Sequence, residues 1–375
     1  MTSSLSEVLL RRWDLAEAAR VMRTSVTDTM RRRIPGDLGL VIQFNPNHIK
    51  FRSWETTQHK RPMDQQLLIS SAKHTKRGFD FTKAKGSISI SEFLCELRFV
   101  GDEQKIPCVQ IIESRRESIQ TSEKSHFALV NVAPLVRGHV LFILDFYRVM
   151  PQRMTEKFLQ FALSISRAMN RQDFALGFNG AGAWSSVNHF HLQGYFYPQT
   201  EDAVNFSVAA QTREELFRIG GTVVKHLPNW FTTCYVLEPD VSSKDELHIV
   251  QIAWHLLNLL QTREVPYNLI IIDTVIFIFP RQPQCENGIT LIPVRDTVQA
   301  GGLRIAVAEL AGLIIAGDSA VYRALDEKAF TLIARKEVSL AADVKLSIEM
   351  EWKETICNAI KDIHRDDANS NAGNV

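Results

Sequence analysis

Two histidines and a glutamine occupy alternate positions in the middle of this 375-residue chain, and they are the residues best suited to do chemistry. A strand over residues 187–197 would place His189, His191 and Gln193 on one face, because side chains alternate between the two faces of a strand. The intervening residues are apolar and would face a core. Burying three polar side chains without partners is costly, so this pattern predicts a functional site.

Three interpretations of the histidine pair are open. Histidines at positions i and i+2 could chelate a metal, but a zinc site needs three or four ligands. Neither a companion cysteine nor a cluster of histidines and carboxylates accompanies the pair. The two histidines could instead be hydrogen-bonded on a sheet without a catalytic role. The third interpretation is a nucleophilic imidazole, whose polar neighbours fix its tautomer and contact a phosphate. We favour the third interpretation and expect neither a metal nor a cofactor.

A run of small residues, Asn179-Gly180-Ala181-Gly182-Ala183, precedes the histidines. Glycines allow the backbone to approach a ligand closely, and successive amide N–H groups can bind an anion. The run is therefore suited to hold an anion close to the two imidazoles.

The overall composition narrows the class of protein. Lys plus Arg number 43 and Asp plus Glu 42, and this balance argues against nucleic-acid binding, which usually needs a basic excess. With 45% hydrophobic residues and 21 phenylalanines, the chain is not globally disordered. The five cysteines are scattered, which predicts free thiols in a reducing compartment. No stretch approaches the roughly 20 apolar residues of a membrane helix, and the N-terminus does not resemble a secretory signal. We therefore expect a cytoplasmic protein that binds no membrane.

The elements expected around the histidines are mostly strands. Strand-like runs occur at residues 38–44, 87–91, 108–112, 127–132, 139–144 and 174–178. One helix is expected over residues 4–33. Another is expected over residues 151–169, where apolar side chains recur at steps of three and four and Pro151 lies in the first turn.

The second half repeats parts of this pattern. A strand–turn–strand pair at residues 269–273 and 275–279 echoes the pair within residues 127–144, which we interpret as a degenerate duplication. Helices are expected over residues 248–262, 303–316 and 322–337. The expected organisation is a helical segment (1–33), a catalytic half (34–200), a degenerate second half (201–362) and a disordered tail (363–375).

The segment His189-Phe190-His191-Leu192-Gln193 resembles the histidine-triad motif in its glutamine-ending form, which belongs to the nucleotidyltransferase branch that includes galactose-1-phosphate uridylyltransferase. Further segments are similar, in order and spacing, to the GDP-hexose phosphorylases, namely animal GDP-D-glucose phosphorylase and plant GDP-L-galactose phosphorylase. These segments are Ile34-Pro35-Gly36, Phe79-Asp80-Phe81-Thr82-Lys83, Val130-Asn131-Val132-Ala133-Pro134-Leu135, Gly138-His139-Val140-Leu141, Gly177-Phe178-Asn179, Pro266-Tyr267-Asn268 and Phe277-Ile278-Phe279-Pro280. The resemblance covers roughly residues 25–340. It implies an α+β fold, an antiparallel sheet with packed helices built from two fused histidine-triad-like halves, of which only the first is catalytic.

The resemblance also implies an activity, the phosphorolysis of GDP-D-glucose to GDP and D-glucose 1-phosphate. His191 would attack the α-phosphorus, expel the hexose 1-phosphate and carry a guanylyl group until phosphate releases it as GDP. His189 would support the nucleophile, and Gln193 and Ser186 would donate to the α-phosphate oxygens. Asn179 and the glycines Gly180 and Gly182 would hold the phosphates.

Four residues upstream are candidates for nucleotide contacts. Lys83 and Arg61 could meet phosphate or guanine, although basic residues are more often solvated. Phe81 could stack on the base, although a core position is the commoner fate of an aromatic side chain. Asp80 could pair with the donor edge of guanine.

Other activities remain open at this stage. One is a related nucleotidyltransferase, either a GDP-galactose or GDP-mannose phosphorylase or a hexose-1-phosphate nucleotidyltransferase that passes the nucleotide to a sugar phosphate. Another is a nucleotide-binding regulator without turnover. Retention of His189, His191 and Gln193 favours an active enzyme. The expected partners are GDP-hexose, phosphate, GDP and hexose 1-phosphate, and no nucleic acid.

Overall fold

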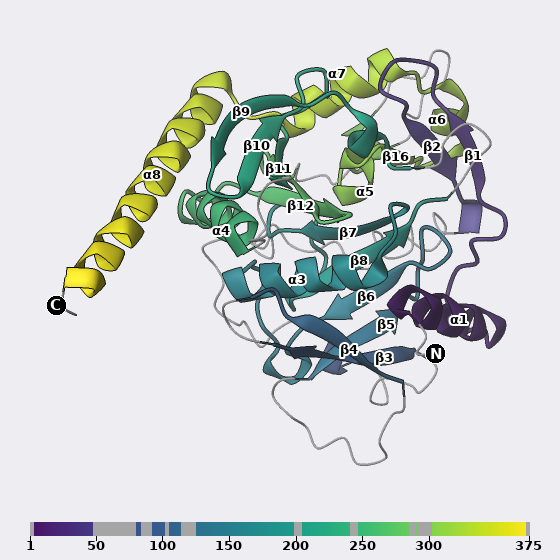
Figure 1. The fold of residues 1–375 in the computed structure, drawn as a ribbon. Coiled ribbons are helices and arrows are strands. Elements are labelled where there is room, and N and C mark those ends of the chain that lie inside the picture. The colour runs from purple at the N-terminus through teal and green to yellow at the C-terminus, as the bar shows by residue number, and fades with distance from the viewer. Residues whose placement is uncertain are drawn as a thin grey trace.

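An antiparallel sheet runs through the centre of the molecule, with helices on both sides (Figure 1). The computed structural model describes residues 4–47, 80–83, 92–101, 105–113, 125–198, 205–240, 247–284, 290–291 and 302–372. Within these residues the sheet has eleven strands in the order β4-β3-β5-β6-β8-β7-β12-β13-β11-β10-β9. Every neighbouring pair is antiparallel.

The strands divide along the chain into a group of six and a group of five. The first group is β3 (Phe93–Val100), β4 (Cys108–Ile112), β5 (His126–Val130), β6 (Val140–Ile143), β7 (Phe174–Asn179) and β8 (His191–Phe196). The second group is β9 (Glu214–Ile219), β10 (Thr222–His226), β11 (Tyr235–Pro239), β12 (Tyr267–Ile272) and β13 (Val275–Pro280). The two groups meet where β7 pairs with β12, and there Asn179 lies opposite Asn268.

The two groups have the same connectivity apart from the edge strand β4, which has no counterpart in the second group, so the expected fusion of two similar halves is confirmed. In the first half four strands lead into a helix, α3 (Glu156–Met169), and in the second half three strands lead into α4 (Leu247–Thr262). Two strands follow the helix in each half. In each half the last strand pairs with the strand before the helix, as β8 pairs with β6 and β13 with β11. The hairpin β12–β13 therefore corresponds to β7–β8, and the proposed echo with residues 127–144 is wrong. Strand–turn–strand patterns look alike in sequence, and only the pairing distinguishes them.

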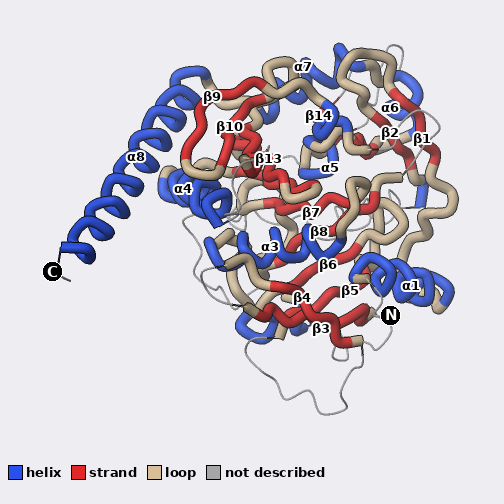
Figure 2. Tube along the Cα trace, in the orientation of Figure 1, coloured by secondary structure: helices blue, strands red, loops and turns tan. Residues whose placement is uncertain are grey.

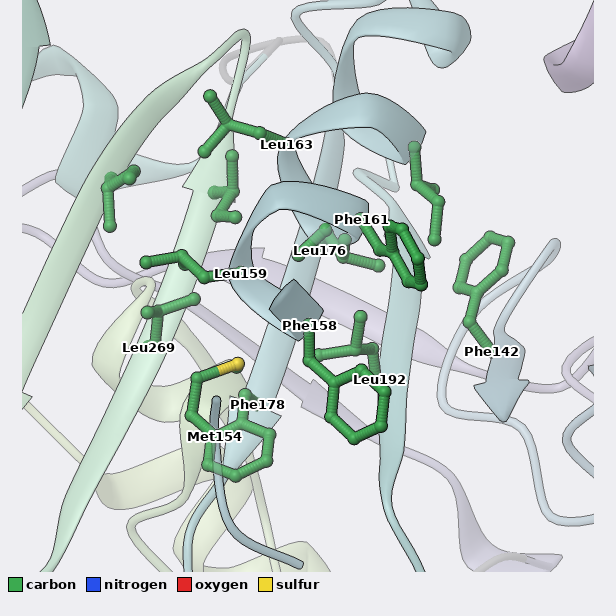
Figure 3. Packing of buried hydrophobic residues seen from close by; sticks show 14 of the residues in the cluster. Phe142, Met154, Phe158, Leu159, Phe161, Leu163, Leu176, Phe178, Leu192 and Leu269 are labelled. Atoms are coloured by element: carbon green, nitrogen blue, oxygen red, sulfur yellow. The ribbon is translucent and has the colours of Figure 1, made fainter. Parts of the chain in front are cut away.

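One face of the sheet is covered by α1 (Leu5–Ala18), α3, α4 and α8 (Ala342–Ala372). Figure 3 shows this core, in which Phe158 and Leu159 of α3 pack toward Leu176, Leu192 and Leu269 of three strands. The period of two in the strands explains the arrangement, because these strand residues all face the helices.

The opposite face carries a second core, formed with short helices and a small sheet (Figure 2). The small sheet contains β1 (Met30–Arg33), β2 (Val41–Phe44) and β16 (Leu313–Ile315). The remaining elements are η3 (Phe81–Lys83), η4 (Phe146–Arg148), η5 (Ser207–Ala210), β14 (Thr290–Leu291), β15 (Gly302–Leu303), α5 (Val307–Leu310), α6 (Ser319–Ala324) and α7 (Glu327–Val338). Residues of β12 that alternate with the helix-facing ones, such as Ile270 and Ile272, point into this second core.

Two predicted helices begin or end elsewhere than expected. The helix predicted over residues 4–33 ends at Ala18, and residues 31–33 lie in β1, where the guanidinium of Arg32 donates to the carbonyls of Tyr322 and Leu325. The helix predicted from Pro151 begins at Glu156, because the side chain of Thr155 caps it by accepting from Phe158 N–H.

Two segments near the C-terminus also differ from the predictions. Residues 303–316 contain only the single turn α5, since Gly312 has a φ of +98° and the chain then joins β2 as β16. Helix α8 continues to Ala372, whereas the polar composition predicts a disordered tail from residue 363. Extending an existing helix is easier than starting one, and the next glycine is Gly373. In Figure 1 the end of α8 projects from the body.

The predicted strand at residues 87–91 lies outside the described residues. Among the helices that the structure does describe, none combines the length and the apolar character needed to cross a membrane.

Candidate active site

The two histidines lie at the start of β8, on the sheet face opposite α3. The predicted strand over residues 187–197 begins only at His191, so His189 precedes it, and both side chains are buried. His191 Nδ1 lies 2.8 Å from the backbone oxygen of His189. A carbonyl oxygen can only accept, so Nδ1 carries the proton and Nε2 of His191 keeps its lone pair.

The buried position of His191 also decides its charge. Burial lowers the pKa of His191 to about 4, and the hydrogen bond to the His189 carbonyl opposes this shift only in part. The imidazole is therefore neutral near pH 7. A neutral ring with a lone pair on Nε2 is the form that can act as a nucleophile.

A short segment far upstream covers both imidazoles. Phe81 N–H, in η3, donates to Nδ1 of His189 at 3.2 Å. The Phe81 ring lies 5.3 Å from the ring of His189 and 5.4 Å from that of His191, measured between centroids. Phe146 in η4 packs on His189 at 5.7 Å. These apolar rings exclude water from the histidines and cause the desolvation that lowers the pKa of His191.

Gln152 fixes the backbone that carries His191. Its buried side chain accepts from His191 N–H at 2.9 Å and donates to the carbonyls of His191 and Asn179, each at 3.0 Å. Its backbone N–H also donates to the side chain of Asn188 at 3.0 Å. Gln152 thus connects the start of β8 to the end of β7, and this fixes the position of the His191 backbone relative to β7.

Gln193 is two residues beyond His191 on the same face and is half-buried. Its Oε1 accepts from the hydroxyl of Tyr195 at 2.5 Å and lies 3.2 Å from Nε2 of His139. His139 Nδ1 in turn accepts from Leu135 N–H at 3.1 Å. His139 thus caps the turn at Leu135, and the same ring also reaches Gln193.

The loop of small residues packs against the second half of the chain. Gly180 N–H donates to the carbonyl of Tyr267 at 3.1 Å, and a Cβ at Gly180 would lie 2.7 Å from that oxygen. Gly182 has a φ of +74°, which favours glycine. Asn179 Oδ1 accepts from Asn268 Nδ2 at 2.7 Å and from Val307 N–H at 3.0 Å. This loop is therefore fixed by contacts across the joint between the halves.

The comparison with known proteins follows this geometry. Residues 4–195 match the family described as GDPGP1-like, N-terminal domain, and residues 207–362 match GDPGP1-like, C-terminal domain. The chain belongs to the GDPGP1-like family. The expected resemblance to the GDP-hexose phosphorylases is thereby confirmed.

Individual relatives of this GDPGP1-like chain are distant. GDP-L-galactose phosphorylase 2 of Arabidopsis thaliana is 27% identical over 343 residues, which cover 90% of this chain and 73% of the plant protein. GDP-D-glucose phosphorylase 1 of Xenopus laevis is 27% identical over 177 residues, which cover 47% of this chain and 40% of the frog protein. The crystal structure of yeast Ap4A phosphorylase Apa2 in complex with Ap4A is similar over 91% of this chain and 100% of that chain, with a TM-score of 0.54 and 14% identity. At that identity the likeness shows the fold, and it confirms the expected histidine-triad-like α+β class.

The other predicted site residues of the GDPGP1-like chain that the structure describes lie in the segments that flank the two histidines in sequence or in space. Ser186 is exposed, in the segment that leads into β8. Asp80 accepts from the backbone and side chain of Thr82 and so begins η3 next to Phe81. Lys83 ends η3, but its side chain and all of Arg61 lie outside the described residues.

Sequence reasoning missed the supporting residues. Gln152 and Tyr195 were not expected in the site, and Asn268 was named only within Pro266-Tyr267-Asn268, one of the segments similar to the GDP-hexose phosphorylases. Gln152 lies 39 residues from its partner His191, so no local spacing could reveal it. In the described part of the chain, no group of three or more His, Cys, Asp or Glu side chains is arranged to hold a metal ion.

Proposed function

We propose that this protein is a GDP-hexose phosphorylase that converts GDP-D-glucose and phosphate to GDP and D-glucose 1-phosphate. Family membership supports a phosphorylase that acts on a GDP-sugar, as the names of its relatives state for those proteins. The observation that carries the chemistry is the 2.8 Å contact between His191 Nδ1 and the His189 carbonyl, which leaves Nε2 as a free base.

In the first step, Nε2 of His191 attacks the α-phosphorus of the GDP-sugar. The bond from the α-phosphorus to the bridging oxygen breaks, and that oxygen leaves on hexose 1-phosphate. The ring becomes a guanylyl-imidazolium whose positive charge is stabilised by the hydrogen bond from Nδ1 to the His189 carbonyl. A phosphate monoester is a stable leaving group, so this step requires little help from an acid.

In the second step, an oxygen of inorganic phosphate attacks the same α-phosphorus from the side that the hexose phosphate left. The bond from phosphorus to Nε2 breaks, GDP forms, and His191 returns to its neutral state. Gln193 and Ser186 would donate hydrogen bonds to the α-phosphate oxygens, where negative charge increases in both transition states. Asn179, Gly180 and Gly182 would lie along the remaining phosphate, where Gly180 would allow close approach without donating, since its N–H is bonded to the Tyr267 carbonyl.

Guanine would be contacted by residues upstream of the histidines. Asp80 would accept from the donor edge of the base, with Lys83 and Arg61 near the phosphates. The Phe81 ring contacts both imidazoles in the structure, so its stacking on guanine would extend an aromatic wall that already borders the nucleophile.

L-Galactose is a second candidate for the hexose. The match to GDP-L-galactose phosphorylase 2 extends over 90% of this chain, whereas the match to the Xenopus GDP-D-glucose phosphorylase 1 covers 47%. The two relatives are about equally identical to this chain, and the match to the L-galactose enzyme is the longer one, so both sugars should be tested as substrates.

A substrate panel tests the proposal. The purified protein is incubated with phosphate and with GDP-D-glucose, GDP-L-galactose, GDP-D-mannose or UDP-D-glucose, and released nucleoside diphosphate and hexose 1-phosphate are measured. GDP-D-glucose is expected to give the highest kcat/KM, with equimolar GDP and D-glucose 1-phosphate. Equal turnover of UDP- and GDP-glucose contradicts the proposal, and so does a requirement for a sugar phosphate in place of phosphate.

A further inference from the structure

Gln193 can serve a phosphate only if its amide is turned the right way. The two ends of a glutamine amide have opposite hydrogen-bonding character, since Oε1 accepts and Nε2 donates. A phosphoryl oxygen needs the donor end. Some other part of the protein must therefore hold Oε1 away from the ligand.

Two side chains converge on that oxygen. Tyr195, two residues along β8, donates its hydroxyl to Gln193 Oε1 at 2.5 Å. The Nε2 atom of His139, the residue just before the neighbouring β6, lies 3.2 Å from the same oxygen. The rings of His139 and Tyr195 pack together with centroids 4.5 Å apart, and both side chains are buried.

The tautomer of His139 is decided by the backbone. Leu135 N–H lies 3.1 Å from His139 Nδ1, and a backbone N–H can only donate. Nδ1 must therefore be the acceptor, and the proton of the neutral ring is on Nε2. The amide nitrogen of Asn131, 3.1 Å from Nε2, can then make no hydrogen bond with it, since both are donors. His139 Nε2–H then donates to Gln193 Oε1.

The turn that supplies this N–H is itself fixed. Gln43 of β2 donates through Nε2 to the Leu135 carbonyl at 3.0 Å and accepts from Arg31 Nε at 3.2 Å. Gln43 is buried. A continuous series of hydrogen bonds thus runs from the small sheet through Leu135 and His139 to Gln193.

We infer that His139 and Tyr195 are positioning residues for Gln193, whose amide they hold with its N–H groups toward the α-phosphate of the nucleotide. This inference rests on the proposed function for the identity of the ligand. The two residues do not touch the reacting atoms. Their effect on turnover passes through the glutamine amide alone.

A double-mutant cycle on the full-length protein tests the inference. Tyr195→Phe removes one donor to Oε1 and keeps the ring against His139, so kcat/KM is expected to fall by about 2- to 13-fold, the value of one neutral hydrogen bond. Gln193→Met is expected to reduce it further. In the Gln193→Met protein, adding Tyr195→Phe is expected to change nothing, because the amide through which Tyr195 acts is gone. Equal losses from Tyr195→Phe in both backgrounds would overturn the inference.

Tyr235→Phe is the matched control. Tyr235 is also a buried tyrosine whose hydroxyl donates to a side-chain oxygen, Glu349 Oε1 at 2.8 Å, but it lies on the helix-covered face of the second half. Its replacement is expected to lower the melting temperature and leave kcat/KM unchanged. A similar loss of turnover in this variant would mean that Tyr195 acts through stability only.

A measurement without substrate separates this inference from the proposed function. In protein labelled with 15N-histidine, the ring nitrogen shifts of His139 are expected to report the Nε2–H tautomer, whether or not any GDP-sugar is turned over. An Nδ1–H tautomer would overturn the inference. Absence of turnover by the unsubstituted protein, combined with the Nε2–H tautomer, would instead refute the proposed function.

Discussion

The contacts of Gln152 lead to a quantitative prediction for the Gln152→Met variant. Methionine has similar length and no hydrogen-bonding amide, so it removes all three hydrogen bonds from the side chain to His191 and Asn179. A net hydrogen bond contributes about 0.5–1.5 kcal/mol, and a buried group left without a partner costs about 1–3 kcal/mol. The expected loss in the free energy of unfolding is therefore about 3–5 kcal/mol.

That loss can be measured as a change in melting temperature. The entropy of unfolding is about 2.1 cal/mol/K per residue, so for a chain of this length the melting temperature should decrease by about 4–6 °C. The nucleophile should also move, because Gln152 holds the peptide of His191 on both sides. A misplacement of about 1 Å can reduce the rate about 100-fold, so kcat should fall by about 10- to 100-fold with little change in KM.

Gln261→Met is the matched control for this prediction. Gln261 is buried in α4 and makes one side-chain hydrogen bond, Nε2 to the Met154 carbonyl at 3.3 Å. Its replacement should lower the melting temperature by about 1–2 °C and leave kcat unchanged. If Gln152→Met retains full kcat and is no less stable than Gln261→Met, then Gln152 does not hold the nucleophile.

Three further predictions follow from the site. Incubation with GDP-hexose and no phosphate should release one hexose 1-phosphate per active site and leave a GMP adduct on the protein that is labile to acid and stable to alkali. The His191→Ala variant should form no adduct. The His189→Ala variant should still form part of the adduct, because the contact to His191 Nδ1 comes from the backbone carbonyl of residue 189. Ser186→Ala should lower kcat/KM by about 10- to 150-fold without loss of stability, and full activity would show that its hydroxyl points elsewhere. Burial lowers the pKa of His126 and of His191 to about 4, so below pH 6.5 the folded state binds fewer protons than the unfolded state. The stabilisation from each neutral histidine should be complete above pH 6.5 and should fall by about 3 kcal/mol as the pH approaches 4. When the melting temperature is measured against pH, this acid-induced decrease should be smaller in His126→Gln than in the unsubstituted protein.

The local chemistry of the site could be predicted from the sequence because its signal is local. Alternating polar and apolar residues placed His191 and Gln193 on one strand face, and the structure has Leu192 in the core opposite them. His189 could not be placed in the same way. The chain leaves the strand geometry before His191 so that the carbonyl of His189 can reach Nδ1, and no propensity encodes that bend.

The supporting contacts could not be predicted because they join distant parts of the chain. His139 lies 54 residues from Gln193, and Phe81 lies 108 residues from His189. A histidine that caps a turn and one that orients a glutamine have the same sequence signature. Only the pairing of β6 with β8 brings His139 within reach of the site.

The connection between the last two strands differs between the two halves. In the first half, residues 180–190 join β7 to β8 and supply the His189 carbonyl and the Asn188 side chain. In the second half only Asp273 and Thr274 join β12 to β13, both with positive φ, as in a tight hairpin. A two-residue turn has no residue to place opposite a ring nitrogen, and β13 begins with Val275.

The second half nevertheless contributes to the site through its first hairpin strand. Asn268 of β12 donates to the side chain of Asn179 at 2.7 Å and to the carbonyl of Ala183 at 3.0 Å. These two bonds hold both ends of the small-residue loop that precedes the histidines. Because Asn268 lies opposite Asn179 at the junction of the halves, the second half stabilises this conformation of the small-residue loop. The apolar strands of the second half therefore support the site, and this accounts for a half that retains the fold without the histidines.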